Sequence, residues 1–331
     1  MSRDETPLVR DVPDEEAYTY VHRVFLQSFF THGVMTVDEI KPVLAAIMTA
    51  HNPERPFPEG DVTQQGLITP LIQTINAKLE PYNFEIRHAR DQTTKVTTYA
   101  LINKTSDSLT QLATRFSASE IAYIRRLLDA MFDTNNTPTR EILAVKQMDA
   151  SQLARPRRAR QSQAANLADE HEASSQTADT GITMAEADHV LDALVADQFL
   201  RLSRAKYYSL APRALMELHS YLKETYNEEA AAADDDNDDD DNNEEPTIRI
   251  RDCEGCREIV TFGIRCNNRE CGVRWHDGCA NQYYRGKSSE GKKCPKCKTL
   301  CSGNVYVGER ADRVQSRNSR QGEMEGEEED D

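Results

Sequence analysis

The sequence has no cysteine in its first 252 residues and only one tryptophan, Trp275. It also has no run of eighteen apolar residues, so no transmembrane helix is expected. Residues 1–16 are polar and acidic, with neither the apolar stretch of a signal peptide nor the Arg-rich amphipathic pattern of a presequence. We therefore expect neither a membrane-spanning nor a secreted protein.

Apolar residues make up only 38% of the 331 residues, which is low for one large compact domain. We expect several small folded units joined by unfolded segments. The formal charge of −16 is unfavourable for nucleic-acid binding, but eleven acidic residues lie in 228–245 and seven in 323–331. The rest of the chain is therefore close to neutral, and the acidity marks two local, unfolded segments.

Residues 14–104 are predicted to form a winged helix. Apolar residues recur at three- and four-residue spacing, and Thr36 with Glu39 forms a capping box despite the nearby Pro42, which should kink the helix. Two short β-type runs follow. The order is helix, helix, helix, strand, strand, with the elements expected at 14–30, 36–47, 63–78, 84–88 and 96–102.

The same order returns in residues 117–226, which predicts a second winged helix. Ser117 with Glu120 and Thr183 with Glu186 form capping boxes for two of its helices. The elements are expected as helices at 117–131, 138–145 and 183–195, strands at 199–202 and 206–210, and a closing helix from Pro212.

Four segments are expected to be unfolded because they are polar or strongly charged. They are the N-terminus 1–13, an insertion 150–180 in the second winged helix, an acidic linker 227–246 and an acidic tail 305–331. The linker is expected to separate the helical region from a zinc domain at 247–304. Replacing Cys266 by serine should then unfold that domain alone.

The chemistry lies in a string of cysteines and one histidine. It reads Cys253-x2-Cys256-x9-Cys266-x4-Cys271-x4-His276-x2-Cys279-x14-Cys294-x2-Cys297. Zinc prefers four N or S ligands, so eight ligands predict two structural zinc ions, each contributing on the order of 10 kcal/mol to a segment too small to fold alone. Spacing does not determine which pairs share an ion, and the eighth cysteine, Cys301, is interpreted as a spare thiol.

This pattern resembles the RING-type cross-brace with ligand order four Cys, one His, three Cys. The resemblance implies one zinc on Cys253, Cys256, His276 and Cys279, and a second zinc on Cys266, Cys271, Cys294 and Cys297. Plant homeodomain fingers share the ligand order, but they usually carry an aromatic residue two positions before the seventh ligand, where this chain has Lys292.

In RING ubiquitin ligases, the conjugating enzyme contacts an aliphatic residue before the second ligand, an aromatic residue after the sixth and a proline after the seventh. A basic residue after the eighth ligand contacts ubiquitin. The resemblance assigns Tyr283, Pro295 and Lys298 to the last three positions, whereas Gly255 occupies the first, which predicts a weaker grip. A RING domain supplies no nucleophile, so no catalytic residue is expected.

Tandem winged helices followed by this finger resemble the RING-like non-SMC element one family of the chromosome-maintenance complex built on the fifth and sixth SMC proteins. The resulting fold class is mostly α with small β wings. The resemblance implies a nuclear, chromosome-associated ubiquitin ligase subunit involved in DNA repair and recombination. Its implied partners are a MAGE-type subunit, a kleisin, the SMC heterodimer and a ubiquitin-conjugating enzyme.

The winged helices are expected to contact protein rather than DNA. A DNA-reading third helix needs polar or basic side chains, and the first repeat offers only Gln73 and Asn76 there. In the second repeat, acidic residues on that helix would repel phosphates. Non-specific contact with the DNA backbone stays open for the first wing, through Arg87, His88, Arg90 and Lys95.

A basic cluster lies within the predicted insertion, at Arg155, Arg157, Arg158 and Arg160. It could be a nuclear import signal, a DNA-contacting patch or a solvated linker. Two alternatives to the ligase stay open for the whole chain. One is a zinc-stabilised scaffold without activity, which Gly255 favours, and the other is a chromatin or DNA reader.

Overall fold

The computed structural model describes residues 18–104, 115–156, 181–227, 248–288 and 291–312. They form two compact units. The first unit comprises the described residues up to Asp91 and those at 95–104, and the second comprises the remainder together with Gln92–Thr94. Among the described helices, none has both the length and the apolarity needed to cross a membrane.

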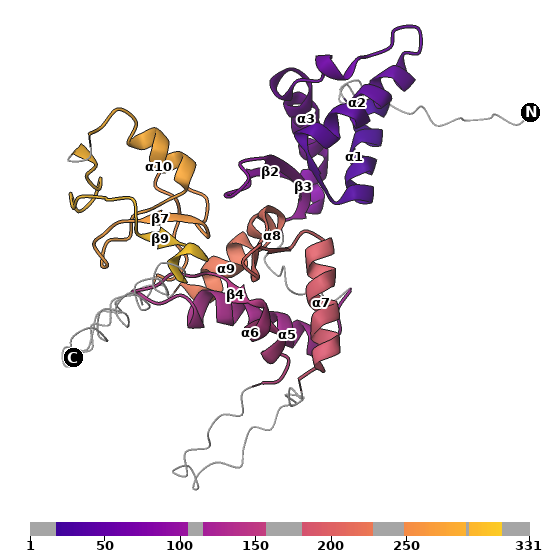
Figure 1. Cartoon of the computed structure of the whole chain (residues 1–331). Coiled ribbons are helices and arrows are strands. Elements are labelled where there is room, and N and C mark those ends of the chain that lie inside the picture. The colour runs from indigo at the N-terminus through magenta and orange to yellow at the C-terminus, as the bar shows by residue number, and fades with distance from the viewer. Residues whose placement is uncertain (1–17, 105–114, 157–180, 228–247, 289–290, 313–331) are drawn as a thin grey trace, which may run out of the picture. The chain divides into compact units, whose positions relative to one another are not determined.

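The first unit is a winged helix, as its sequence predicts (Figure 1). Its three strands form an antiparallel sheet in the order β1-β3-β2. Phe25, Ile40 and Ile75 are fully buried between the helices and the sheet. The main elements are α1 (Tyr20–His32), β1 (Val34–Thr36), α2 (Val37–His51), α3 (Thr69–Leu79), β2 (Phe84–Arg90) and β3 (Thr97–Asn103).

The predicted capping box begins α2. Glu39 N donates to Thr36 Oγ1 (3.4 Å), and Thr36 N donates to Glu39 Oε2 (2.7 Å). These bonds satisfy backbone donors that have no partner within the helix. The helix continues through Pro42 to His51. The sequence did not reveal β1, which is only three residues long and depends on pairing with the distant β3.

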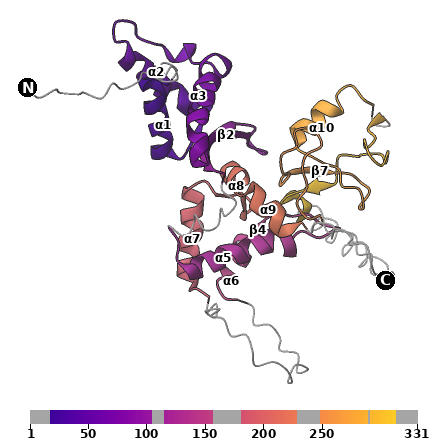
Figure 2. The ribbon, with the colours of Figure 1, turned by 180° about the vertical axis from the view of Figure 1, so that it is seen from behind.

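The helical part of the second unit repeats this arrangement. Its sheet order, β4-β6-β5, matches that of the first unit, and α7 runs across α5 (Figures 1 and 2). Both predicted capping boxes are present, at Ser117 and Thr183. The elements are α5 (Ala118–Asp129), η5 (Ala130–Thr134), β4 (Val145–Lys146), α6 (Gln147–Gln152), α7 (Met184–Ala196), β5 (Leu200–Leu202), β6 (Tyr207–Leu210), α8 (Pro212–Glu217) and α9 (His219–Tyr226).

The predicted helix at 138–145 is wrong. Residues 135–144 form a loop closed by a bridge between Asn136 and Glu141, and the second helix of this repeat is α6. Tertiary contacts bury Ile142, Leu143 and Ala144 without a helix. The expected insertion at 150–180 is also wrong at its start, because α6 extends to Gln152; residues 157–180 lie outside the described part.

The third part of the chain carries the predicted zinc ligands, and we call it the zinc domain. Its elements are β7 (Gly263–Arg265), β8 (Arg274–Trp275), α10 (Asp277–Tyr283) and β9 (Tyr306–Val307), with sheet order β8-β7-β9. The expectation that the tail is unfolded from residue 305 is wrong up to 312. Arg310 Cζ lies 4.1 Å from the ring centroid of Phe262 and 4.5 Å from that of Tyr306. These cation–π contacts hold a segment whose charge predicted that it would be unfolded.

The zinc domain and the second winged helix share one compact unit and one cluster of buried apolar residues. The described ends of the acidic segment meet, because Asn227 and Ile248 form a β-bridge. Asn227 Oδ1 also accepts hydrogen bonds from Arg249 N (3.0 Å) and Ile250 N (2.8 Å). This differs from the expectation that the segment separates two independent parts, because charge does not reveal how far apart its ends lie.

Candidate metal centre

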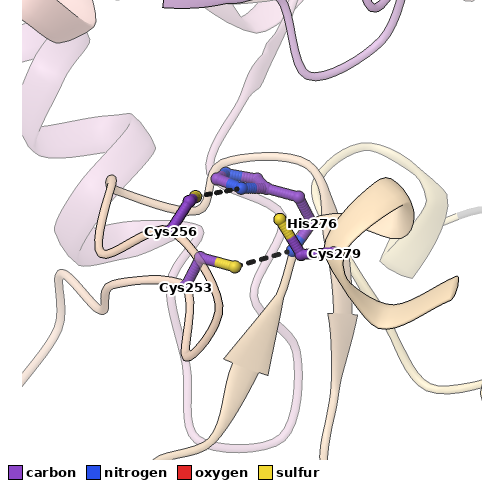
Figure 3. A group of neighbouring side chains, drawn as sticks. All are labelled: Cys253, Cys256, His276 and Cys279. Carbon is purple, nitrogen blue, oxygen red and sulfur yellow. Dashed lines mark hydrogen bonds between the residues drawn. The ribbon is translucent and has the colours of Figure 1, made fainter. Parts of the chain in front are cut away.

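Four of the predicted ligands, Cys253, Cys256, His276 and Cys279, come together in one group (Figure 3). Their potential ligand atoms all lie within 4.8 Å of one another. Cys253 and Cys256 lie on a turn closed by the bond from Arg257 N to Cys253 O (2.9 Å). His276 follows β8, and Cys279 lies in α10.

The other four predicted ligands, Cys266, Cys271, Cys294 and Cys297, form a second group. Their sulfur atoms also all lie within 4.8 Å of one another. The Sγ atoms of Cys266 and Cys297 are 3.4 Å apart, and those of Cys271 and Cys294 are 3.6 Å apart. Cys266 directly follows β7, and a turn resembling the first one joins Cys294 to Cys297, with Lys298 N donating to Cys294 O (3.2 Å).

The two groups interleave along the chain as a cross-brace. The first and third ligand pairs form one group, and the second and fourth pairs form the other. Pairing of β7 with β8 brings the second and third pairs to neighbouring strands. This is the grouping that the RING resemblance implied and that spacing alone left open. Cys301 lies outside both groups and is buried.

The histidine is oriented for ligation through Nδ1. Its Nδ1 lies 3.2 Å from Cys256 Sγ (Figure 3). Its Nε2 lies 3.2 Å from the carbonyl oxygen of Ile259. When Nε2–H donates to that carbonyl, the lone pair remains on Nδ1, facing the three sulfurs. Such an outer hydrogen bond is the usual way in which proteins fix a ligating imidazole.

The thiols of the first group have divergent pKa values. Burial raises the pKa of Cys253, but hydrogen bonds from His276 and from backbone N–H groups outweigh it and bring the pKa down to about 6. Burial and the neighbouring thiolates raise the pKa of Cys279 to about 12. Three thiols so close together cannot all ionise unless a cation compensates their charge.

The second group shows the same conflict. The hydrogen bond with the Thr299 hydroxyl lowers the pKa of Cys297 to about 6, whereas burial raises the pKa of Cys266 and Cys271. One set of three sulfurs with one nitrogen and one set of four sulfurs both suit tetrahedral zinc. The structure therefore contains two groups fitted to a metal, and zinc as the ion stays a prediction.

The three residues assigned to conjugating-enzyme contact lie on the surface of the zinc domain. Tyr283 is 38% exposed at the end of α10 and stacks on Trp275, with ring centroids 4.7 Å apart. Pro295 and Lys298 lie on the second Cys-x2-Cys turn, where Lys298 Nζ donates to Pro295 O (2.7 Å). The role of these residues stays a prediction.

Gly255 has a structural explanation. A Cβ atom at this position would lie 3.1 Å from Cys279 Cβ and 3.2 Å from Trp275 Cζ3. Both distances are shorter than ordinary carbon contacts. The indole of Trp275 therefore fills the space next to the position where the RING pattern has an aliphatic side chain.

The basic cluster is only partly visible. Arg155 is exposed just after α6, while Arg157, Arg158 and Arg160 lie outside the described residues.

In the first unit, the side chain of Asn76 is hydrogen-bonded to the backbone of β2. Its Nδ2 donates to Ile86 O (3.0 Å), and Ile86 N donates to its Oδ1 (2.7 Å).

Sequence reasoning missed a group of charged side chains beside the second ligand group. Glu141, Arg265 and Arg274 are buried together. One signal was available, because Arg274 lies between two apolar residues, Val273 and Trp275, in the middle of the ligand string. Its acceptor, however, lies 133 positions earlier in a loop, and no local pattern connects them.

Two family models match the chain. The model described as "Nse1 non-SMC component of SMC5-6 complex" matches residues 22–218. The model described as "RING-like domain" matches residues 253–297, which include all eight predicted ligands. The first match covers most of the region of the two winged helices, and the second lies within the predicted zinc domain.

Curated relatives carry the name "Non-structural maintenance of chromosomes element 1 homolog". The Bos taurus protein is 24% identical and the Homo sapiens protein 23% identical over 282 residues, covering 84% of this chain and 83% of each relative. A solved structure titled "Nse1-Nse3-Nse4 complex" matches with a TM-score of 0.59 at 19% identity, over 86% of this chain and 96% of that chain. At this identity the match shows a shared fold.

Proposed function

Because the chain belongs to the family of the Nse1 non-SMC component of the SMC5-6 complex, we propose that it is a RING-type ubiquitin ligase subunit of such a complex. The observation that carries this proposal is the pair of four-ligand groups in a RING-like cross-brace. Surface residues at three of the four RING contact positions add support. The fourth position, Gly255, departs from the pattern.

The proposed mechanism is positioning. Ubiquitin passes from the cysteine of the conjugating enzyme to a substrate lysine, and the ligase holds the thioester in a reactive orientation. Two bound zinc ions would supply rigidity to the loops that carry the contact residues. Tyr283 and Pro295 would contact the conjugating enzyme, while Lys298 would contact ubiquitin.

The proposed partners follow from the family and from the solved complex. The matching structure is titled as a complex with Nse3 and Nse4, which supports binding of a MAGE-type subunit and a kleisin by this chain. Membership of the family supports association with the SMC heterodimer and with chromosomes in the nucleus. Arg155 and its basic neighbours would serve in nuclear import.

The structure favours protein over DNA as the partner of the winged helices. Asn76 is occupied by the backbone of β2 and is not available to read a base. In the second repeat, the exposed face of α7 presents Glu186, Asp188 and Asp192, which would repel phosphates. A steep salt dependence of duplex binding that falls when Arg87 and Arg90 are replaced would contradict this assignment.

Discharge of ubiquitin from a charged conjugating enzyme tests the ligase. The protein is assayed with its MAGE-type and kleisin partners, and Tyr283→Ala and Lys298→Ala should each slow discharge at least tenfold. Matched controls are Tyr82→Ala, at an exposed tyrosine of the first unit, and Lys293→Ala, at an exposed lysine of the zinc domain. All variants should hold two zinc ions.

The second candidate is a scaffold whose zinc domain only stabilises subunit contacts. The tight packing around Gly255 favours it, because the position of the usual aliphatic contact is closed by Trp275. The scaffold predicts full assembly with the partners and no discharge above that of the conjugating enzyme alone. Unchanged discharge in Tyr283→Ala and Lys298→Ala would remove the contacts on which the ligase mechanism rests.

A further inference from the structure

The second winged helix has a loop that the first one lacks. In the first repeat only Gly33 separates α1 from β1, whereas in the second repeat ten residues, 135–144, separate η5 from β4. We call residues 135–144 the docking loop, because this stretch contacts the zinc domain at several points. It occupies the place where the sequence suggested a helix.

Glu141 makes the central contact of the docking loop. Its Oε1 accepts from Arg265 NH1 (2.8 Å) and from Arg274 NH2, and its Oε2 accepts from Arg274 Nε (2.8 Å). All three residues are at most 8% exposed. Both arginines belong to the zinc domain, so one carboxylate of the winged helix joins two strands, β7 and β8.

Further hydrogen bonds extend this contact along the docking loop. Asn136 Nδ2 donates to Arg249 O (2.8 Å), and Pro138 O accepts from Arg265 NH1 (2.9 Å). The carbonyl oxygen of Glu141 accepts from Gly308 N (2.8 Å) in the segment after β9. The loop thus holds the zinc domain through both its side chains and its backbone.

The end of the described chain makes a second attachment. The carboxylate of Asp312 lies 2.9 Å from Lys146 Nζ and 3.3 Å from Arg140 NH1, and it accepts a hydrogen bond from the Tyr207 hydroxyl. All three partners belong to the second winged helix. Asp312 follows β9, which pairs with β7 of the zinc domain.

The contact at Glu141 also reaches the second ligand group. Arg274 NH1 donates to the backbone oxygens of Cys271 (2.6 Å) and Val273 (2.9 Å), and Cys271 is one of the four sulfur ligands. A buried guanidinium is strongly unfavourable without a charge partner. Loss of the Glu141 charge would leave Arg274 unpaired next to the metal group.

We propose that the docking loop fixes the orientation of the zinc domain on the second winged helix, with Glu141 as the positioning residue. A partner bound to the winged helices could then influence the zinc domain, because the two are held as one body. The influence of a bound partner on the zinc domain rests on the proposed ligase function. The attachment of the zinc domain to the winged helix does not depend on it.

Hydrogen exchange of the zinc-loaded full chain tests the attachment. In Glu141→Gln, which removes the charge and keeps the shape, exchange of residues 135–144 and 305–312 should rise at least tenfold, while the chain still binds two zinc ions. Asp312→Asn should raise exchange in 305–312 with both zinc ions retained, and it serves as the second variant if Glu141→Gln does not fold. The matched control is Glu224→Gln, at an exposed glutamate of α9.

Two results would overturn the proposal. Exchange that stays at the wild-type rate in the variants would show that these contacts do not hold the zinc domain. Exchange that rises only together with loss of zinc would show that Glu141 stabilises the zinc-bound fold of the domain and does not attach the domain to the winged helix.

The ligase arm is measured separately, as the ratio of discharge rates with and without the MAGE-type partner. We expect this ratio to fall towards one in Glu141→Gln at full zinc content, and to stay at the wild-type value in Glu224→Gln. An unchanged ratio would refute transmission through the docking loop. If the wild-type protein shows no discharge at all, the proposed function fails, and hydrogen exchange alone decides on the attachment.

Discussion

Replacing Gly255 by isoleucine should damage the first ligand group rather than improve the ligase. The substitution restores the aliphatic residue of the RING pattern, so resemblance alone would predict a stronger grip on the conjugating enzyme. The structure predicts the opposite. The new Cβ alone would lie 3.1 Å from Cys279 Cβ and 3.2 Å from Trp275 Cζ3, and isoleucine adds three more carbon atoms beyond it.

The magnitude follows from the cost of overpacking. Inserting carbons into a closely packed site typically costs about 1–3 kcal/mol. Trp275 cannot easily move, because it is 4% exposed and stacked on Tyr283, so strain should pass to the ligand Cys279. If all of the strain falls on the zinc-bound state, affinity at the first group should drop about 5- to 150-fold, since about 1.4 kcal/mol corresponds to a factor of ten.

Competition with a chromogenic chelator measures this loss, and the second ligand group provides an internal control because its affinity should not change. Gly255→Ala should show a smaller loss, since only one carbon is added. Wild-type zinc affinity in Gly255→Ile, together with faster ubiquitin discharge, would refute the packing argument. It would also show that the grip on the conjugating enzyme is limited only by the missing side chain.

Three further predictions concern the two units. Thr36→Ala removes the cap of α2 and should lower the free energy of unfolding of the first unit by about 1 kcal/mol, without moving the second transition in calorimetry. Tyr226→Phe removes the 2.8 Å bond to Asp129 Oδ1 and should lower the stability of the second unit by about 1–2 kcal/mol in urea unfolding. Chelation of zinc should destabilise the whole second unit but not the first, as followed by hydrogen exchange, because one buried cluster joins the zinc domain to the winged helix.

Local signals predicted much of the fold. The capping boxes at Thr36, Ser117 and Thr183 fall at the observed helix starts, because the cap is made by residues three positions apart. The strands β1 and β4 were missed, since runs of three and two residues show no periodicity and depend on distant partners. The incorrect helix at 138–145 arose because apolar residues there are buried by tertiary contacts.

The metal groups were predictable in a different way. The ligand types and spacings identified all eight residues, and the resemblance supplied the grouping that spacing could not. Glu141 carried no signal of its own, since a single glutamate in a loop is usually solvated. Its two arginine partners lie 124 and 133 positions away, so only the folded chain reveals the contact.

The bridge between Asn227 and Ile248 has a practical consequence. Because the described residues on either side of 228–247 are paired with each other, this segment need not span any distance. The entropy cost of closing a flexible loop grows only with the logarithm of its length. The position should therefore accept a shortened or lengthened segment, and even an inserted reporter domain whose termini are close together, at little cost in stability.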